Sequence, residues 1–261
     1  MTSSELKRHP DDYPRTALVT GGAQRIGLAI SRSLAAAGWA VAVHHHQSGE
    51  DAAALVAEIE ATGGWAAAIQ ADLSKEAEVE TLVPAASEAL GPLGLLVNNA
   101  AVFEMDRIGD ATRASWDFHV EINLRAPFLL TQSFARALPP EQGGAVINIL
   151  DERVLKLTPN YVTYTLSKSG LWTLTRSLAI ALAPRIRVNG IGPGYALPER
   201  GTSPSDFDRA VAGMPLGRST DPDEICSALH FLLAAKSMTG QMIVLDGGQH
   251  LGWLVPQSEA P

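Results

Sequence analysis

RTALVTGGAQRIG, residues 15–27, decides the fold of this chain. Its first half is a short apolar run that ends in glycine, which is typical of a buried parallel strand. From Arg25 the sequence RIGLAISRSLAAAG has helical periodicity and stops at Gly38. Glycines between strand and helix permit a tight turn in which backbone N–H groups approach a pyrophosphate. The stretch predicts a strand–turn–helix unit that binds a dinucleotide, although a plain turn has the same pattern.

Strands and helices keep alternating after this unit. Further strands are predicted at residues 39–46, 65–73, 93–100, 143–150, 185–194 and 241–248, and further helices at residues 50–64, 75–91, 112–138, 161–183 and 222–235. Pro127 is expected to kink or break the helix at 112–138. The alternation predicts an α/β fold, a single doubly wound Rossmann-like domain with a seven-stranded parallel sheet, over residues 15–261. The polar residues 1–14 are predicted to be a disordered leader.

The composition excludes several classes of protein. The chain has 261 residues, of which 46% are hydrophobic and 18% are charged, and its net charge is −8. This charge argues against a nucleic-acid or anionic-membrane surface. A single cysteine, Cys226, rules out an internal disulfide and a cysteine-based zinc site, and its apolar surroundings predict a buried helix position. With no membrane-spanning run and no signal-peptide core, the protein is predicted to be cytoplasmic.

The end of the second predicted strand selects the cofactor. NAD enzymes usually carry an acid there that holds the ribose 2′-hydroxyl. Here the sequence is HHHQS, residues 44–48, with no acid before Glu50, and Arg25 in the glycine turn is expected to reach the same corner. Imidazole, hydroxyl and guanidinium groups suit a 2′-phosphate, so NADP(H) is predicted. Consecutive strand residues point to opposite faces, so the histidine run does not predict a metal site.

Other polar residues follow the third and fourth predicted strands. Asp72-Leu73 can place a carboxylate against an adenine amino group, and Asn98-Asn99-Ala100-Ala101 ends in small residues that permit close approach of a ribose. Each is weak evidence alone, because Asp and Asn are ordinary turn residues. All of them lie at carboxyl ends of strands, where such sheets bind ligands.

A catalytic pair is predicted on the helix at 161–183. Tyr164 and Lys168 are one helical turn apart and lie on the same face. A nearby ammonium group favours the phenolate, so Lys168 is expected to pull the pKa of Tyr164 down from about 10 towards neutrality. Tyr164 then becomes a proton donor or acceptor for a carbonyl/alcohol or imine/amine pair.

These motifs together resemble the short-chain dehydrogenase/reductases. The resemblance covers about Arg15 to Leu251 and rests on T-G-x-x-x-x-I-G, N-N-A-A, Asn123, Y-x-x-x-K and Pro193-Gly194 in the order and spacing of that family. It implies that Tyr164 is the general acid/base, that Lys168 binds the nicotinamide ribose, and that Asn123 holds a proton-relay water. The cofactor site is predicted to comprise Gly21, Arg25, Ile26, Gly27, His45, His46, Gln47, Ser48, Asp72, Leu73, Asn99, Ala100, Ala101, Tyr164, Lys168, Pro193 and Gly194.

One position departs from the general family pattern. The family usually has a serine about thirteen residues before the tyrosine, where this chain has Asp151. The pteridine reductases and dihydromonapterin reductases carry an aspartate there, and TGGAQRIG, HHHQS and DGGQHL also look similar to their sequences. The resemblance implies that Phe103 stacks on a pterin ring, although Phe103 also fits a loop aromatic that covers the core edge. Ala101-Val102 and Gln47 differ from the residues of the pteridine reductases.

The resemblance implies an NADPH-dependent reductase of a pteridine. The substrate site is predicted to comprise Arg25, Phe103, Asp151, Tyr164 and Tyr195, with the loop Tyr195–Thr220 as its lid. Asp151 is expected to help protonate a ring nitrogen, although it also fits a neutral polar replacement of serine. The alternatives are a general carbonyl or 3-oxoacyl-thioester reductase and a dinucleotide-sensing protein without turnover. The family is commonly tetrameric, so a homotetramer with the helix at 161–183 between subunits is expected.

Overall fold

A single parallel sheet forms the centre of the molecule. The computed structural model describes residues 13–198 and 203–252. Its strands are β1 (Thr16–Val19), β2 (Ala40–His45), β3 (Ala66–Gln70), β4 (Leu95–Asn98), β5 (Gly144–Ile149), β6 (Ile186–Pro193) and β7 (Met242–Leu245). They pair in the order β3-β2-β1-β4-β5-β6-β7, and every pairing is parallel. The predicted Rossmann-like fold with seven parallel strands is confirmed.

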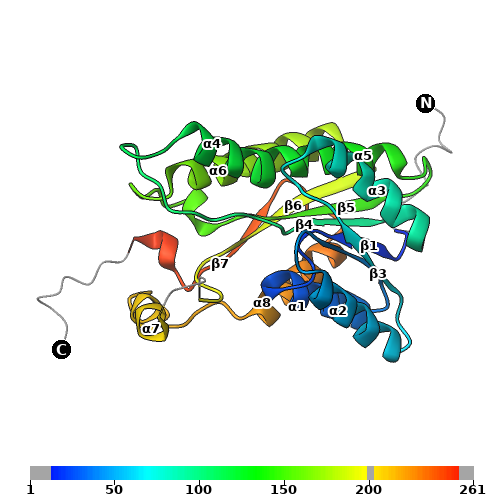
Figure 1. Cartoon of the computed structure of the whole chain (residues 1–261), viewed down its shortest axis with the longest axis horizontal. Coiled ribbons are helices and arrows are strands. Elements are labelled where there is room, and N and C mark those ends of the chain that lie inside the picture. Colours follow the sequence, from blue (N-terminus) through cyan, green and yellow to red (C-terminus); the bar gives the residue numbers. More distant parts are fainter. Residues whose placement is uncertain (1–12, 199–202, 253–261) are drawn as a thin grey trace, which may run out of the picture.

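Helices cover both faces of the sheet (Figure 1). The α-helices are α1 (Arg25–Ala36), α2 (Gly49–Ala61), α3 (Glu76–Leu90), α4 (Arg113–Val120), α5 (Ala126–Ala137), α6 (Val162–Ala181), α7 (Pro204–Ala212) and α8 (Pro222–Ala234). Short helices are the π-helix η2 (Glu121–Arg125) and the 3-10 turns η3 (Glu152–Val154) and η4 (Gln249–Leu251). In Figure 1, α1, α2 and α8 lie below the sheet, α3 to α6 lie above it, and α7 stands apart near β7.

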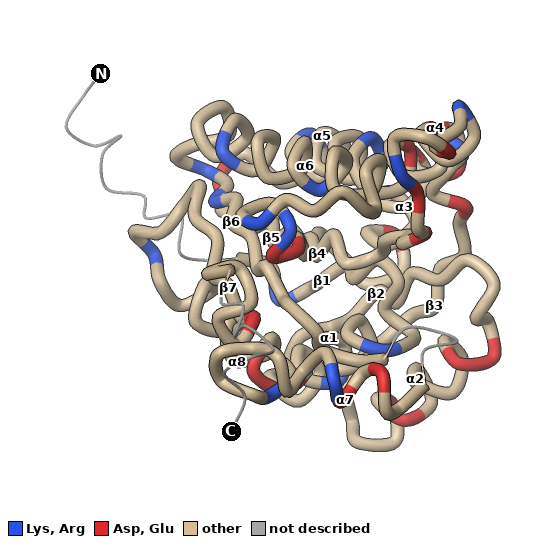
Figure 2. Tube along the Cα trace, turned by 90° about the vertical axis from the view of Figure 1, so that its left-hand side faces the viewer, with Lys and Arg blue, Asp and Glu red and all other residues tan. Residues whose placement is uncertain are grey.

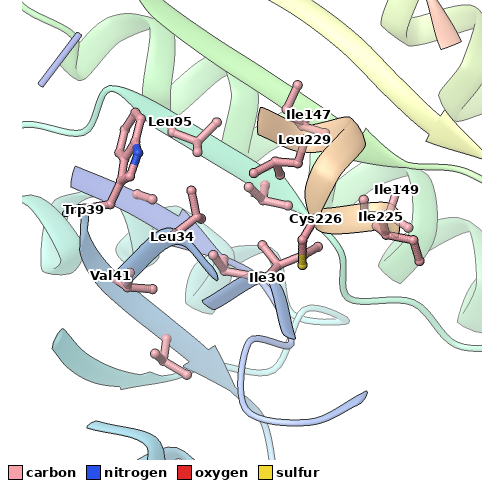
Figure 3. Close-up of a cluster of buried hydrophobic side chains, with 14 of the residues drawn as sticks. Ile30, Leu34, Trp39, Val41, Leu95, Ile147, Ile149, Ile225, Cys226 and Leu229 are labelled. Carbon is pink, nitrogen blue, oxygen red and sulfur yellow. The ribbon is translucent and has the colours of Figure 1, made fainter. Parts of the chain in front are cut away.

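A hydrophobic core fills each space between sheet and helices. The cluster drawn in Figure 3 joins side chains of α1, such as Ile30 and Leu34, to Ile225 and Leu229 of α8 and to the underside of the sheet. Cys226 is a free thiol within this cluster and is 5% exposed, which agrees with its predicted buried helix position. The second cluster lies between the sheet and α3, α5 and α6. These two cores fix the carboxyl ends of the strands at one edge of the sheet.

The strand order reverses between β1 and β4, which are neighbours in the sheet. In doubly wound sheets, ligands bind in the crevice at such a switch point, outside the carboxyl ends of the strands. The glycine turn follows β1, and Asn99 and Asp151 follow β4 and β5. The fold therefore brings the predicted site residues to one edge.

The helix predicted at 112–138 changes its hydrogen-bond pattern without a break. Its residues keep α-helical φ and ψ angles at both ends of η2, so α4, η2 and α5 follow one another directly. Pro127 lies in the first turn of α5, directly after the π-turn, where a residue without an N–H is accommodated. The change of pattern places Asn123 inside a π-turn, a feature that is frequent at functional sites.

The predicted loop Tyr195–Thr220 contains a helix. Ser203 caps the N-terminus of α7 by accepting a hydrogen bond from Asp206 N, and Pro204 occupies its first turn. Serine before proline at a helix start is a recognised signal. The prediction of an irregular loop was therefore wrong over Pro204–Ala212.

Two residues of the predicted leader, Tyr13 and Pro14, contact the domain. Tyr13 Oη accepts a hydrogen bond from Arg187 Nε at 3.0 Å, and Pro14 packs so tightly that a Cβ on Gly94 would lie 2.1 Å from its carbonyl oxygen. Arg187 also donates to carbonyl oxygens at the end of α8 and just beyond it, namely those of Leu232, Leu233, Ala235 and Met238. Residues 1–12 of the predicted leader, and residues 253–261 of the predicted domain, lie outside the described residues.

The surface carries charges of both signs. Figure 2 shows Lys and Arg among Asp and Glu over both helical layers. No helix in the described part of the chain is long and apolar enough to cross a membrane.

Candidate active site

The turn after β1 requires glycine at two positions. Gly21 has φ +59°, and a Cβ there would lie 3.2 Å from Ala100 Cα. A Cβ on Gly27 would lie 2.0 Å from Gly21 O and 2.6 Å from Asn99 Nδ2. The backbone of the turn therefore lies against the first turn of α1 with no room for a side chain. Such a cradle is the arrangement that lets N–H groups at a helix N-terminus meet a phosphate.

Side chains from the neighbouring strands hold this turn. His44 Nδ1 accepts a hydrogen bond from Gly21 N at 3.0 Å, and His44 Nε2 contacts Ala71 O at 3.1 Å, which assigns its proton to Nε2. Burial lowers the pKa of His44 to about 4, so the ring is neutral at physiological pH. Asn99 Nδ2 donates to Thr20 O at 2.8 Å. The role of His44 was missed at the sequence level, where it was only one member of a basic run.

The corner beyond β2 is an open groove of about 750 Å³, and the four predicted residues His45 to Ser48 line it. His45 Nδ1 is buried there without a hydrogen-bond partner. His46 Nε2 lies 3.8 Å from Asp72 Oδ2. Asp72 itself accepts hydrogen bonds from Ser74, and the Leu73 side chain is in the core.

Arg25 does not reach this corner. Its guanidinium donates to Pro198 O at 2.9 Å and to Leu197 O at 3.2 Å, on the opposite side of the glycine turn. The backbone explains this direction, because Arg25 has φ +53° and follows a β-region Gln24. The prediction that Arg25 lies at the 2′-phosphate corner was wrong, whereas its prediction as a pocket residue agrees with the structure.

Three of the four predicted catalytic residues, Asp151, Tyr164 and Lys168, lie between β5 and α6. Tyr164 is 5% exposed, and its hydroxyl donates to Asp151 Oδ2 at 2.7 Å. Lys168 is buried one turn further along α6 and donates to Ile149 O at 2.7 Å. Lys168 Nζ lies 5.9 Å from the centre of the Tyr164 ring. The structure thus joins Asp151 directly to Tyr164, with the lysine behind them.

The pKa of Tyr164 moves opposite to the expectation from sequence. Burial raises it well above its ordinary value, and the neighbouring Asp151 carboxylate raises it further. Burial also lowers the pKa of Lys168 to about 8. The expectation failed because it weighed only the lysine, whereas the phenol lies in a desolvated site and donates to a carboxylate. Tyr164 is therefore held protonated, as a proton donor.

Asn123 fixes the loop that follows β4. Its Oδ1 accepts from Val102 N at 2.9 Å, and its Nδ2 donates to Val102 O at 2.9 Å and to Ser167 Oγ at 3.1 Å. The side chain is completely buried and contacts neither Tyr164 nor Asp151 through these bonds. It positions the loop that carries Phe103, and its predicted role of holding a water stays a prediction.

A cavity of about 330 Å³ lies in front of the Tyr164 hydroxyl. All five predicted substrate residues line it, together with Ile26 and Gly194 of the predicted cofactor site. Sequence reasoning missed Arg153 and Tyr161, whereas the other lining residues belong to the segment predicted as the lid, namely Ala196, Leu197, Asp206, Phe207 and Ala210. The last three belong to α7, the helix that replaces part of the predicted loop.

Phe103 forms an aromatic wall of this cavity. Its ring stacks on Tyr161, with centres 4.3 Å apart and planes 9° apart, and meets Tyr164 edge-on at 4.5 Å. Tyr161 adopts the left-handed conformation, φ +58°, immediately before α6. Phe103 thus lines the cavity, and its stacking on a pterin ring stays a prediction. Within the described residues, no group of three His, Cys, Asp or Glu side chains is placed to hold a metal ion.

Known proteins with similar sequences are oxidoreductases. The family model described as enoyl-(acyl carrier protein) reductase matches residues 21–250. An uncharacterized oxidoreductase of Methylorubrum extorquens is 38% identical, over 90% of this chain and 97% of its own. A 3-oxoacyl-[acyl-carrier-protein] reductase of Synechocystis sp. is 32% identical, over 90% of this chain and 96% of its own.

Similar solved structures contain NADP or NADPH. FolM alternative dihydrofolate reductase 1 from Brucella canis, complexed with NADP, is 47% identical with a TM-score of 0.89, and the match covers 93% of this chain and 96% of that one. The Brucella suis protein, also with NADP, is 47% identical with a TM-score of 0.90, over 95% and 99%. A blue fluorescent protein from a metagenomic library, in complex with NADPH, is 34% identical with a TM-score of 0.84, over 89% and 96%.

Proposed function

The chain belongs to the short-chain dehydrogenase/reductase family of oxidoreductases, and we propose that it is an NADPH-dependent reductase of a pteridine such as dihydrofolate, dihydrobiopterin or dihydromonapterin. The observation that carries the proposal is the hydrogen bond from Tyr164 Oη to Asp151 Oδ2, at 2.7 Å, on the wall of a cavity that Phe103 also lines. The 47% identity to two proteins described as alternative dihydrofolate reductases supports it.

The residues present fit NADP(H). The glycine cradle excludes side chains where a pyrophosphate would approach, and His45 Nδ1 is an unpartnered buried polar atom beside the predicted 2′-phosphate corner. His45, His46, Gln47 and Ser48 would hold that phosphate. NADPH, when bound, supplies a hydride. The side chains of the protein hold the substrate and supply the proton.

The side chains around the cavity supply the proton. Reduction of a C=N bond adds hydride at carbon and a proton at nitrogen. Tyr164, whose pKa is raised by burial and by Asp151, carries its proton throughout the neutral range and lies at the cavity wall. Its O–H is directed to Asp151, so it turns from that carboxylate to the ring nitrogen to deliver the proton. Asp151 receives the hydrogen bond of that hydroxyl and orients it. Lys168 lies behind the pair, where the family places the ribose of the nicotinamide.

A 3-oxoacyl-thioester reductase is the second candidate. The family model and the 32% identical relatives favour it. A thioester or ketone oxygen needs hydrogen-bond donors, and the serine usual in the family supplies one. An ionised Asp151 can only accept hydrogen bonds, so it suits a ring with N–H groups better than a simple carbonyl.

Consumption of NADPH separates the two candidates. The purified protein is mixed with NADPH and, in separate cuvettes, with dihydrobiopterin, dihydrofolate or an acetoacetyl thioester, and the loss of absorbance is followed at acidic and neutral pH. We expect loss with a pteridine and little with the thioester. Loss with the thioester alone would refute the pteridine proposal, and loss with any substrate excludes a binding protein without turnover.

A further inference from the structure

Arg153 is a mostly buried cation, and most N–H groups of its guanidinium lack a good hydrogen-bond partner. Its side chain is 13% exposed, and Nε is buried without a partner. Its nearest carboxylate is Asp151, with Nη1 3.4 Å from Oδ1, a long and weak contact. Among the described residues, Nη2 has no hydrogen-bond partner. By contrast, Arg187 is also partly buried and uses all three of its nitrogens. Buried arginines are normally satisfied, so Arg153 calls for a ligand.

The guanidinium is held in place beside the reacting groups. Its central carbon lies 5.1 Å from the ring centres of both Phe103 and Tyr161, which stack 4.3 Å apart. A point equidistant from two stacked rings lies beside the stack and not over one ring face. The planar group therefore rests against the edge of the aromatic wall, next to Asp151, and lines the same cavity as Tyr164.

The cavity wall therefore presents two kinds of hydrogen-bonding group next to each other. Tyr164 and Asp151 form the place where a ring nitrogen would receive its proton, and the guanidinium of Arg153 adds a donor beside them. In a dihydropterin the C=N nitrogen lies next to a ring carbonyl oxygen, so the substrate has a second acceptor close to the first. A simple ketone has one carbonyl oxygen and no second acceptor, and the second carbonyl of a 3-oxoacyl thioester is on a flexible chain and not fixed in a ring.

We propose that Arg153 is a specificity-determining residue that donates a hydrogen bond to the ring carbonyl oxygen of the substrate while Tyr164 serves the neighbouring nitrogen. This inference rests on the proposed pteridine reduction. The donors are the Nη groups of Arg153, because Nε is buried. The proposal also gives Arg153, two positions after Asp151, a part in the discrimination between a pteridine and a simple carbonyl.

The test compares ligands that differ only at that oxygen. Arg153→Met keeps the length and apolar body of the side chain, and Arg153→Lys keeps the charge without the planar fork. Arg113→Met is the matched control, because Arg113 is 87% exposed on α4 and pairs only with Asp117 among described residues. Dissociation constants are measured in the presence of NADP⁺ for a 2-amino-4-oxopteridine and for the 2,4-diamino compound, in which a donor replaces the oxygen.

We expect Arg153→Met to weaken binding of the oxo ligand about tenfold to a hundredfold, which is the effect of losing a hydrogen bond to a charged group. Binding of the diamino ligand should weaken far less. Arg153→Lys should be intermediate, and Arg113→Met should resemble the wild type. NADPH affinity and thermal midpoint identify any variant that has lost its fold. Equal weakening of both ligands, or of neither, would overturn the role of Arg153 while pteridine reduction stands. A wild-type protein that neither binds the oxo ligand nor oxidises NADPH with a dihydropterin would overturn both proposals.

Discussion

Asp151 orients the hydroxyl of Tyr164 in the active site. It receives the Tyr164 hydrogen bond at Oδ2 and the Arg153 backbone N–H at Oδ1, 2.9 Å away, so both oxygens are held in fixed directions. Asp151→Ser restores the residue that is usual in the family. We expect kcat/KM for a dihydropterin to fall about a hundredfold or more, and that for a simple ketone to change by less than about tenfold. Steady-state kinetics with both substrates test this, and an equal loss for both would exclude a pteridine-specific role.

Glu152 lowers the stability of the protein at neutral pH. It is 2% exposed, Oε1 accepts from Gln249 Nε2 at 2.8 Å, and Oε2 is buried without a partner. Burial, followed by repulsion from Asp151, raises its pKa from 4.5 to about 7. Between these values the folded state binds more protons than the unfolded state, so stability falls as pH rises through this window and the penalty is complete above it.

Glu152→Gln should remove this penalty. We expect the free energy of unfolding to rise by up to about 3 kcal/mol at pH 8 and by about 1 kcal/mol at pH 5. Urea denaturation of variant and wild type at both pH values measures the difference. Glu60→Gln, on the exposed face of α2, is the control and should have little effect at either pH. The same gain for Glu152→Gln at pH 5 and pH 8 would show that ionisation is not the cause.

At the scale of elements, the glycine turn and α1 form one unit. Alanine inside a helix is usually better than glycine by about 1 kcal/mol. In α1, however, a Cβ on Gly27 would meet the carbonyl oxygen of Gly21 at 2.0 Å. We expect Gly27→Ala to force the turn open and weaken NADPH binding about a hundredfold or more, as measured by fluorescence titration. Gly109→Ala, where a Cβ meets nothing within 4 Å, should bind NADPH like the wild type. Unchanged affinity in Gly27→Ala would mean that the turn is not the phosphate cradle.

The elements themselves could be predicted from sequence, because apolar runs and helical periodicity are local. The pair Tyr164 and Lys168 followed from helix spacing alone. The direction of the Arg25 side chain could not be predicted, because its acceptors lie in a loop 172 and 173 positions further along the chain. The direction of His44 could not be predicted either, because sheet pairing brings its partner Gly21 close. Arg153 was not predicted as a site residue, because its neighbours Phe103 and Tyr161 come from other segments of the chain. Contacts between different elements could therefore not be predicted from the sequence.

At the scale of the whole molecule, α6 exposes two large apolar side chains, with the polar side chains of Thr173, Arg176 and Ser177 also exposed between them. Leu166 is 48% exposed and Ile180 is 82% exposed, and positions fourteen residues apart return to nearly the same side of a helix. This face fits the homotetramer that the family resemblance predicts. Light scattering after size exclusion should give a tetramer for the wild type and a smaller species for Ile180→Glu. Trp65→Glu, which changes a 71% exposed residue before β3, should leave the mass unchanged. A monomeric wild type, or an intact tetramer of Ile180→Glu, would refute this assembly.

The bond between Tyr13 and Arg187 has a consequence for synthesis on the ribosome. The two residues are 174 positions apart, so Tyr13 leaves the exit tunnel on the order of ten seconds or more before its partner. During part of that time β1 also lacks β4, which pairs along its other edge. The nascent chain thus carries an open strand edge, the kind of surface on which unfinished chains associate with one another. The first described residue of the protein is among the last to reach its native contact.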